Sequence, residues 1–225
     1  MMSGTMGTWA KRARAGLVGA MLLVLLPTTT SLFPTVAAAQ ESPQSVIQRV
    51  EARYRSVTTM KAKVTQTRQD AFGSETLSGE LLVKRPSKLR WKLGDKLFVS
   101  NGSKMWIYAP SENQVIVYND VASRQAEAES FLTSMDKLTA NFNVSVVSST
   151  ASGVQLRLAP KSGGQFKSAE IYLNGKLDVY LVQIVDAFDN RTTMSFSGMQ
   201  FNVAADDAQF NFTPPAGVKV VSATP

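Results

Sequence analysis

The chain has 225 residues, with 24 lysines and arginines against 17 aspartates and glutamates, and it contains neither histidine nor cysteine. Their absence excludes Ser-His and Cys-His nucleophile pairs and ordinary zinc sites. Residues 1–39 hold three basic and no acidic residues, so residues 40–225 carry only four more basic than acidic side chains, too mild an excess to indicate a nucleic-acid partner.

The first 39 residues have the three parts of a secretory signal peptide. Three basic residues within 11–14 precede an apolar run, 15–26, and three alanines occupy 37–39. The alternative, a membrane anchor, needs roughly 20 apolar residues, more than this run supplies. We therefore expect cleavage after Ala39 and export of residues 40–225 as one domain. With no cysteine, we expect neither disulfides nor lipid attachment in it.

An amphipathic helix is predicted directly after the cleavage point. Ser42 is suited to the N-cap, and Pro43 to the first helical position. Apolar side chains then recur at helical spacing as far as Val57. Strands are expected next, beginning at Met60 and again at 76–84.

The segment 81–110 predicts an antiparallel meander. After Pro86, charged and apolar residues alternate, which places Leu89 and Trp91 on one face of a strand and lysine and arginine on the other. Residues 100–103 are typical of a hairpin turn, after which the chain returns through Trp106. Arg85 lies at a corner of this meander. An ordinary β-core with solvated lysines is the alternative interpretation.

A second amphipathic helix is predicted over 123–138, followed by five more strands. Its apolar side includes Phe131, Leu132 and Met135. With about ten or eleven short strands in all, the pattern predicts a mainly β single domain, as a barrel or a strongly curved sheet.

Two amphipathic helices in a β-rich chain must bury their apolar faces, and the concave side of a curved sheet is the available place. Such a sheet closed by helices forms an apolar pocket. Simple packing of helices on the sheet is the alternative for each residue. The candidate ligand-binding residues are Leu89, Trp91, Trp106, Phe131, Leu132 and Met135.

No catalytic centre, metal site or cofactor motif is predicted. The acidic residues are scattered, and Asp186 and Asp189, which flank Phe188, belong to a predicted hairpin turn. No glycine-rich phosphate loop occurs. We therefore expect a protein that is not an enzyme.

The meander and the end of the chain resemble the LolA family of periplasmic lipoprotein carriers. The resemblance rests on Val-Lys-Arg-Pro at 83–86, Trp91, Val-Ser-Asn-Gly at 99–102, Met-Trp-Ile-Tyr-Ala-Pro at 105–110 and the closing segment 210–218. It implies an unclosed antiparallel β-barrel with an α-helical lid, whose cavity takes the acyl chains of lipoproteins.

The resemblance also implies partners and a role for one arginine. Such carriers receive acylated lipoproteins from an inner-membrane ABC-type transporter and deliver them to the outer membrane, often to a receptor of the same fold; we expect a monomer. The family's arginine, Arg85 here, holds the lid shut by hydrogen bonds to the lid-helix backbone. Leu89 stands where the family usually has an aromatic residue.

Three other functions stay open at this stage. The same fold serves equally as a carrier of another envelope lipid or glycolipid, since a barrel alone does not define its cargo. A non-catalytic periplasmic sensor or adapter that binds a protein through the curved sheet is the second. A secreted hydrolase is the third, and the lack of a histidine base weighs against it.

Overall fold

The computed structural model describes residues 41–119, 132, 134–161 and 166–223. Residues 40–225 form one compact unit. Among the described residues, no helix is both long and apolar enough to span a membrane. The predicted signal peptide lies outside the described residues, and its cleavage stays a prediction.

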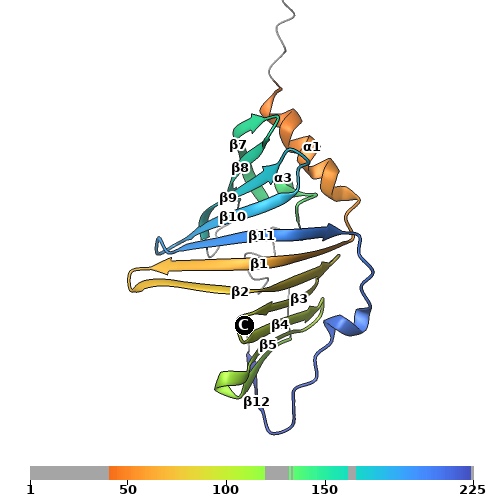
Figure 1. Cartoon of the computed structure of the whole chain (residues 1–225), viewed down its shortest axis with the longest axis vertical. Helices are drawn as coiled ribbons and strands as arrows, with labels where there is room; N and C mark the ends of the chain where they lie inside the picture. Colours follow the sequence, from red (N-terminus) through yellow and green to blue (C-terminus); the bar gives the residue numbers. More distant parts are fainter. Residues whose placement is uncertain (1–40, 120–131, 133, 162–165, 224–225) are drawn as a thin grey trace, which may run out of the picture. The chain divides into compact units, whose positions relative to one another are not determined.

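Twelve strands form a single open sheet (Figure 1). Its order is β12-β6-β5-β4-β3-β2-β1-β11-β10-β9-β8-β7. The strands of the first half of the chain are β1 (Thr59–Asp70), β2 (Gly73–Lys84), β3 (Lys88–Leu93), β4 (Lys96–Asn101), β5 (Met105–Ala109) and β6 (Gln114–Tyr118). Those of the second half are β7 (Phe142–Thr150), β8 (Gly153–Pro160), β9 (Phe166–Asn174), β10 (Val179–Asp186), β11 (Arg191–Phe201) and β12 (Lys219–Ala223).

The mainly β, unclosed architecture is confirmed, but the strand count exceeds the expected ten or eleven because the pattern did not reveal β12. Eleven strands are joined as antiparallel neighbours, whereas β12 pairs in parallel with β6, with Lys219 opposite Gln114. β12 pairs with a strand about a hundred residues earlier in the chain, so no hairpin turn connects the two. Hairpin turns were the signal that identified most of the other strands.

Helix α1 (Pro43–Arg55) confirms the first predicted helix, although it ends two residues before Val57. The Ser42 side chain accepts a hydrogen bond from the Ser45 amide, as expected of an N-cap. The apolar side of α1, comprising Val46, Ile47, Val50 and Tyr54, is buried in the main core together with residues from both halves of the sheet. We call this side of the sheet the inner face.

The second predicted helix, 123–138, falls largely on residues outside those described. Its last part is wrong: residues 134–137 form a bend and a turn, in which the Lys137 amide donates to the Ser134 carbonyl. The short helix α3 (Leu138–Asn141) follows this turn and leads into β7. Two short 3-10 helices complete the described fold: η1 (Pro110–Glu112) and η2 (Asp207–Phe210).

Candidate functional site

Strand β3 places Leu89 and Trp91 on the inner face, as predicted. Leu89 lies opposite Val83, and Trp91 lies opposite Leu81; in antiparallel strands such partners point to the same side. All four belong to the buried core that α1 covers. The Trp91 ring also packs against Phe98 of β4, with ring centroids 5.6 Å apart.

The predicted position of Trp106 is wrong. Trp106 of β5 pairs with Val99, and Val99 pairs with Arg90 of β3. Arg90 alternates with Leu89 and Trp91, so this row points away from the inner face. The turn after β4 sets a register in which Ile107, not Trp106, stands opposite Phe98. Trp106 therefore lies on the outer face and is not part of one stack with Leu89 and Trp91.

The structure brings two more of the predicted residues to the inner core. Leu132 and Met135 are buried in the same cluster as Leu89 and Trp91. Phe131 lies outside the described residues. The inner-face set therefore consists of four of the six candidates, from two segments about forty residues apart.

Arg85 contacts both segments that cover the inner face. Its Nη1 donates to the backbone carbonyl of Tyr54, in the last turn of α1, at 3.0 Å. Its Nη2 lies 3.2 Å from Oδ1 of Asp136, and the two side chains are 18% and 15% exposed. Those two atoms form an ion pair but no well-directed hydrogen bond. A carbonyl at a helix C-terminus lacks an intrahelical donor, which is why the guanidinium fits there.

Sequence reasoning missed Asp136. Asp136 lies between Met135 and Leu138, which are both fully buried. An acidic residue within this apolar segment is the sequence feature that could have indicated a buried ion pair. Buried carboxylates need a charged or hydrogen-bonding partner, and Arg85 supplies it.

Three further contacts hold α1 in place. Arg53 pairs with Asp178 at 2.9 Å. The Tyr54 hydroxyl accepts a hydrogen bond from the Val179 amide at 2.9 Å, and burial raises the pKa of this phenol to about 12. The Glu51 carboxylate accepts bonds from the amide and hydroxyl of Thr139 in α3, at 2.9 and 2.8 Å. The two helices are thus tied to each other and to the sheet.

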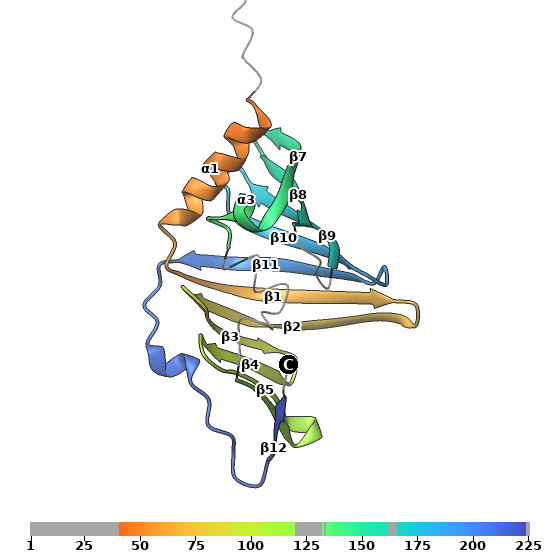
Figure 2. The same ribbon diagram turned by 180° about the vertical axis from the view of Figure 1, so that it is seen from behind.

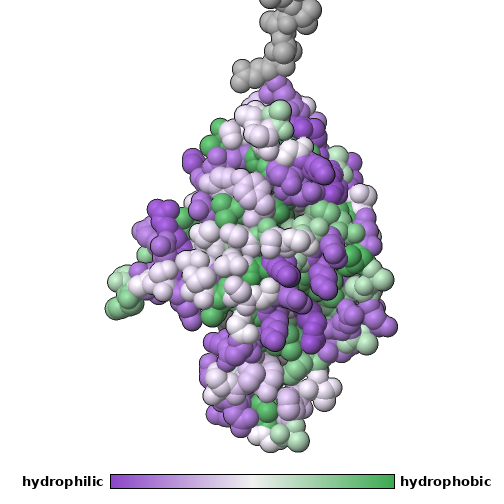
Figure 3. All heavy atoms as spheres, in the orientation of Figure 1, coloured by the Kyte–Doolittle hydropathy of each residue, from purple (hydrophilic) through white to green (hydrophobic). Residues whose placement is uncertain are grey.

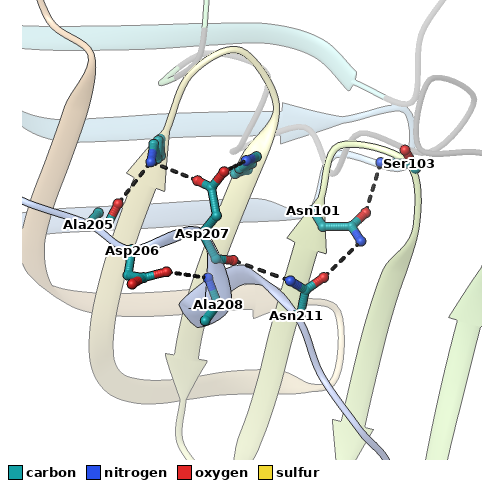
Figure 4. Close-up of polar contacts among 9 residues, drawn as sticks. Asn101, Ser103, Ala205, Asp206, Asp207, Ala208 and Asn211 are labelled. Atoms are coloured by element: carbon teal, nitrogen blue, oxygen red, sulfur yellow. Dashed lines mark hydrogen bonds and ion pairs between the residues drawn. The ribbon is translucent and has the colours of Figure 1, made fainter.

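Residues 202–218, which we call the C-terminal strap, lie against part of the outer face, at β2, β3 and β4. Figure 4 shows Asp207 of η2 between two lysines of the sheet. Lys84 and Lys88 contact its two carboxylate oxygens at 2.7 and 2.6 Å. The hydrogen bond from Lys84, followed in size by that from Lys88, lowers the pKa of Asp207 to about 2. Further along, Asn101 of β4 donates to Asn211 at 3.1 Å.

The strap also has an apolar anchor and borders a groove. Phe210 is fully buried where η2 lies against β3 and β4. Beside it, a groove of about 960 Å³ runs between Ala208 and Gln209 of the strap and outward-facing side chains such as Leu82 and Tyr108. Arg90 spans the junction by donating to the Gln209 carbonyl at 3.2 Å. The strap therefore covers part of the outer face, on the side of the sheet opposite α1.

The comparison with known proteins agrees with this architecture. Residues 55–213 match the family described as "Outer membrane lipoprotein carrier protein LolA". The chain belongs to the LolA family. The match spans β1 to the strap, including Arg85, Asp136 and the inner-face residues.

Individual relatives support the same assignment. An outer-membrane lipoprotein carrier protein of Azotobacter vinelandii is 31% identical, over 83% of this chain and 92% of its own length. That of Dechloromonas aromatica is 28% identical, over 88% and 95%. The crystal structure of an uncharacterized conserved protein from Thermus thermophilus has a TM-score of 0.51 at 15% identity, covering 81% of this chain and 100% of that one; this likeness concerns the fold alone.

Proposed function

We propose that this LolA-family protein is a periplasmic carrier that binds the acyl chains of lipoproteins released from the inner membrane and delivers them to the outer membrane. The observation that carries the proposal is the inner face: an apolar sheet surface, with Leu89 and Trp91, covered by a helix that a few polar contacts hold in place. The carrier names of relatives that match over most of their length support it.

The chemistry of the cargo explains why a cover is useful. Exposing an acyl chain to water costs about 0.8 kcal/mol per methylene group, so a lipoprotein needs an apolar sheath to cross an aqueous compartment. A carrier must also release its cargo. In the proposal, Leu89, Trp91, Leu132 and Met135 contact the acyl chains, and α1 moves to admit them.

Arg85 is proposed as the latch of this lid. Its guanidinium contacts the last turn of α1 and the carboxylate of Asp136. Cargo entry breaks these contacts, so their free energy offsets part of the gain from burying the acyl chains. That offset lowers the affinity and favours handover. The donor of cargo in this scheme is an ABC-type transporter of the inner membrane, and the acceptor is the outer membrane or a receptor in it.

Native mass spectrometry of the protein purified from the periplasm tests the cargo. The proposal predicts triacylated lipoprotein bound in a one-to-one complex. Bound phospholipid or glycolipid without lipoprotein would instead support a carrier of another envelope lipid, and a non-acylated protein partner would support a sensor or adapter.

The Arg85→Leu variant tests the latch. Loss of the guanidinium contacts shifts the lid equilibrium toward the open state by about 1–3 kcal/mol. We expect more lipoprotein bound to the carrier and less passed to outer-membrane vesicles. The matched control is Arg90→Leu, which removes an outer-face arginine that donates to the strap carbonyl of Gln209. Normal transfer by Arg85→Leu ends the latch hypothesis.

A further inference from the structure

Two hairpin tips of the sheet present the most exposed large apolar side chains of the described residues. Phe72, in the turn between β1 and β2, is 99% exposed, and Phe188, in the turn between β10 and β11, is 85% exposed. Phenylalanine side chains are usually buried in folded proteins. Neither ring contributes to the core cluster or the inner-face set described above, so folding does not account for them.

The two turns share one sequence and one construction. Asp70-Ala71-Phe72 forms the first tip and Asp186-Ala187-Phe188 the second. In each, the aspartate Oδ1 accepts a hydrogen bond from the phenylalanine amide two residues on, at 2.8 Å in both cases. The carboxylate thus fixes the turn, and the phenyl ring is held outward in both.

The sheet brings these tips side by side. Strands β1 and β11 are neighbours, and Gln69 pairs with Arg191. Phe72 lies three residues beyond Gln69, and Phe188 lies three residues before Arg191. The register therefore gives the two rings corresponding positions at the same end of these neighbouring strands. Both tips project on one side of the sheet in two opposite views (Figures 1 and 2). Hydrophobic colouring marks the outermost protrusion on that side in Figure 3.

From this geometry we propose that the paired Asp-Ala-Phe tips are a membrane-docking device, whose phenyl rings insert into the interfacial region of a lipid bilayer. Two isolated convex tips suit a lipid surface, which accepts single inserted rings. A stable protein interface requires a contiguous area of about 800 Å² on each partner, which two turns do not offer.

The charges around the tips determine the expected lipid dependence. Arg68 lies opposite Glu75 in the β1–β2 pair, and Lys167 pairs with Asp189 at 2.8 Å. Arg191, opposite Gln69, adds a third cation. Asp70 and Asp186 in the two turns add carboxylates beside it, so the tips carry no excess of positive charge. The rings, rather than anionic headgroups, supply the attraction, and binding is expected to depend weakly on salt and on anionic lipid content.

The position of the tips leaves the proposed latch free. Arg85 follows the last residue of β2, whereas Phe72 precedes its first residue. A strand of twelve residues spans roughly 40 Å, so the docking tips and the latch lie at opposite ends of β2. A bilayer bound at the tips does not cover the latch.

Co-flotation of the periplasm-purified protein with phosphatidylcholine vesicles, and with vesicles containing phosphatidylglycerol, tests the proposal. We expect binding to both, reduced about tenfold by Phe72→Ser or Phe188→Ser and about a hundredfold by the double variant. Tyr180→Ser removes a half-exposed aromatic ring outside the tips and is expected to leave binding unchanged. Both rings are exposed, so the double variant keeps the urea midpoint of the parent protein.

A second readout locates the inserted ring. The difference in Trp emission between Phe72→Trp and the parent, both of which keep Trp91 and Trp106, is expected to shift to shorter wavelength on vesicle addition, and the same difference for Tyr180→Trp is not. Parent protein that fails to float with either vesicle, or a folded double Ser variant that floats as well as the parent, overturns the proposal. Vesicle flotation does not depend on whether the inner face binds acyl chains. Acyl-chain binding is tested separately, by the lipoprotein found in native mass spectrometry.

Discussion

The lid helix α1 on the inner face and the C-terminal strap on the outer face are both fastened to the sheet by cationic side chains, but the surroundings of those charges differ. The Arg85–Asp136 pair is largely enclosed, whereas Asp207, which pairs with Lys84 and Lys88, has a side chain 60% exposed. Exposed ion pairs contribute little and are screened by salt. The strap is therefore held mainly by its buried ring, Phe210. The lid combines an enclosed ion pair with the buried apolar side of α1.

This contrast suits the two covers to different tasks. The packing of Phe210 requires no partner charge, so neither salt nor the loss of an ion pair is expected to release the strap. In the proposed function, cargo that separates Arg85 from Asp136 breaks this enclosed ion pair and opens the lid. The contrast is open to direct measurement.

The largest effect is expected from Phe210→Ala. Removing a fully buried phenyl ring is expected to lower the free energy of unfolding by about 3–5 kcal/mol, measured by urea denaturation. Phe188→Ala, at an 85% exposed position, is the control and is expected to change it by less than about 0.5 kcal/mol. Equal effects of the two variants would contradict the view that this ring anchors the strap.

A smaller effect is expected from the lid pair. A double-mutant cycle with Arg85→Leu and Asp136→Leu is expected to give a coupling free energy of about 1–2 kcal/mol. The same cycle on Arg49 and Glu41, an ion pair at the other end of α1 whose side chains are 46% and 36% exposed, is expected to give a smaller coupling. A coupling for Arg85 and Asp136 no larger than for Arg49 and Glu41 would show that enclosure does not strengthen the lid pair.

The smallest effect concerns the pH dependence of the strap. The pKa of Asp207 is lowered to about 2 from 3.8. Because the folded-state pKa lies below the unfolded one, the carboxylate stabilises the fold above about pH 4, and this contribution is lost as the pH falls toward 2. Unfolding of Asp207→Asn is expected to depend less on pH in this window than that of the parent protein. Identical pH profiles would show that the lysine contacts do not form in solution.

Much of the sheet was predictable because its signals are local. Alternation along 88–93 placed Leu89 and Trp91 on one face, and Ser42-Pro43 marked the start of α1; both predictions are confirmed. Strand β12 was not predictable in this way, since its pairing with β6 is parallel and distant in the chain. The position of Trp106 depended on the register after the turn that follows β4, and one residue of register exchanges the faces.

The candidate site shows the same division. The resemblance pointed to Arg85 and to a helix backbone as its partner, and the structure gives Arg85 such a contact at Tyr54. Asp136 lies in a turn that the helical pattern of 123–138 did not reveal. A carboxylate about fifty residues from its cation is found from tertiary structure, because nothing in the local pattern links the two.

Photocrosslinking from the two faces tests the central claim, that acyl chains bind on the inner face beneath α1. A benzophenone derivative of phenylalanine replaces either Trp91 on the inner face or Trp106 on the outer face, and each protein is irradiated with a triacylated lipopeptide. We expect crosslinks from position 91, abolished by excess unlabelled lipopeptide, and none above background from position 106. Crosslinks from position 106 alone, or equal crosslinking from both faces, would contradict the account.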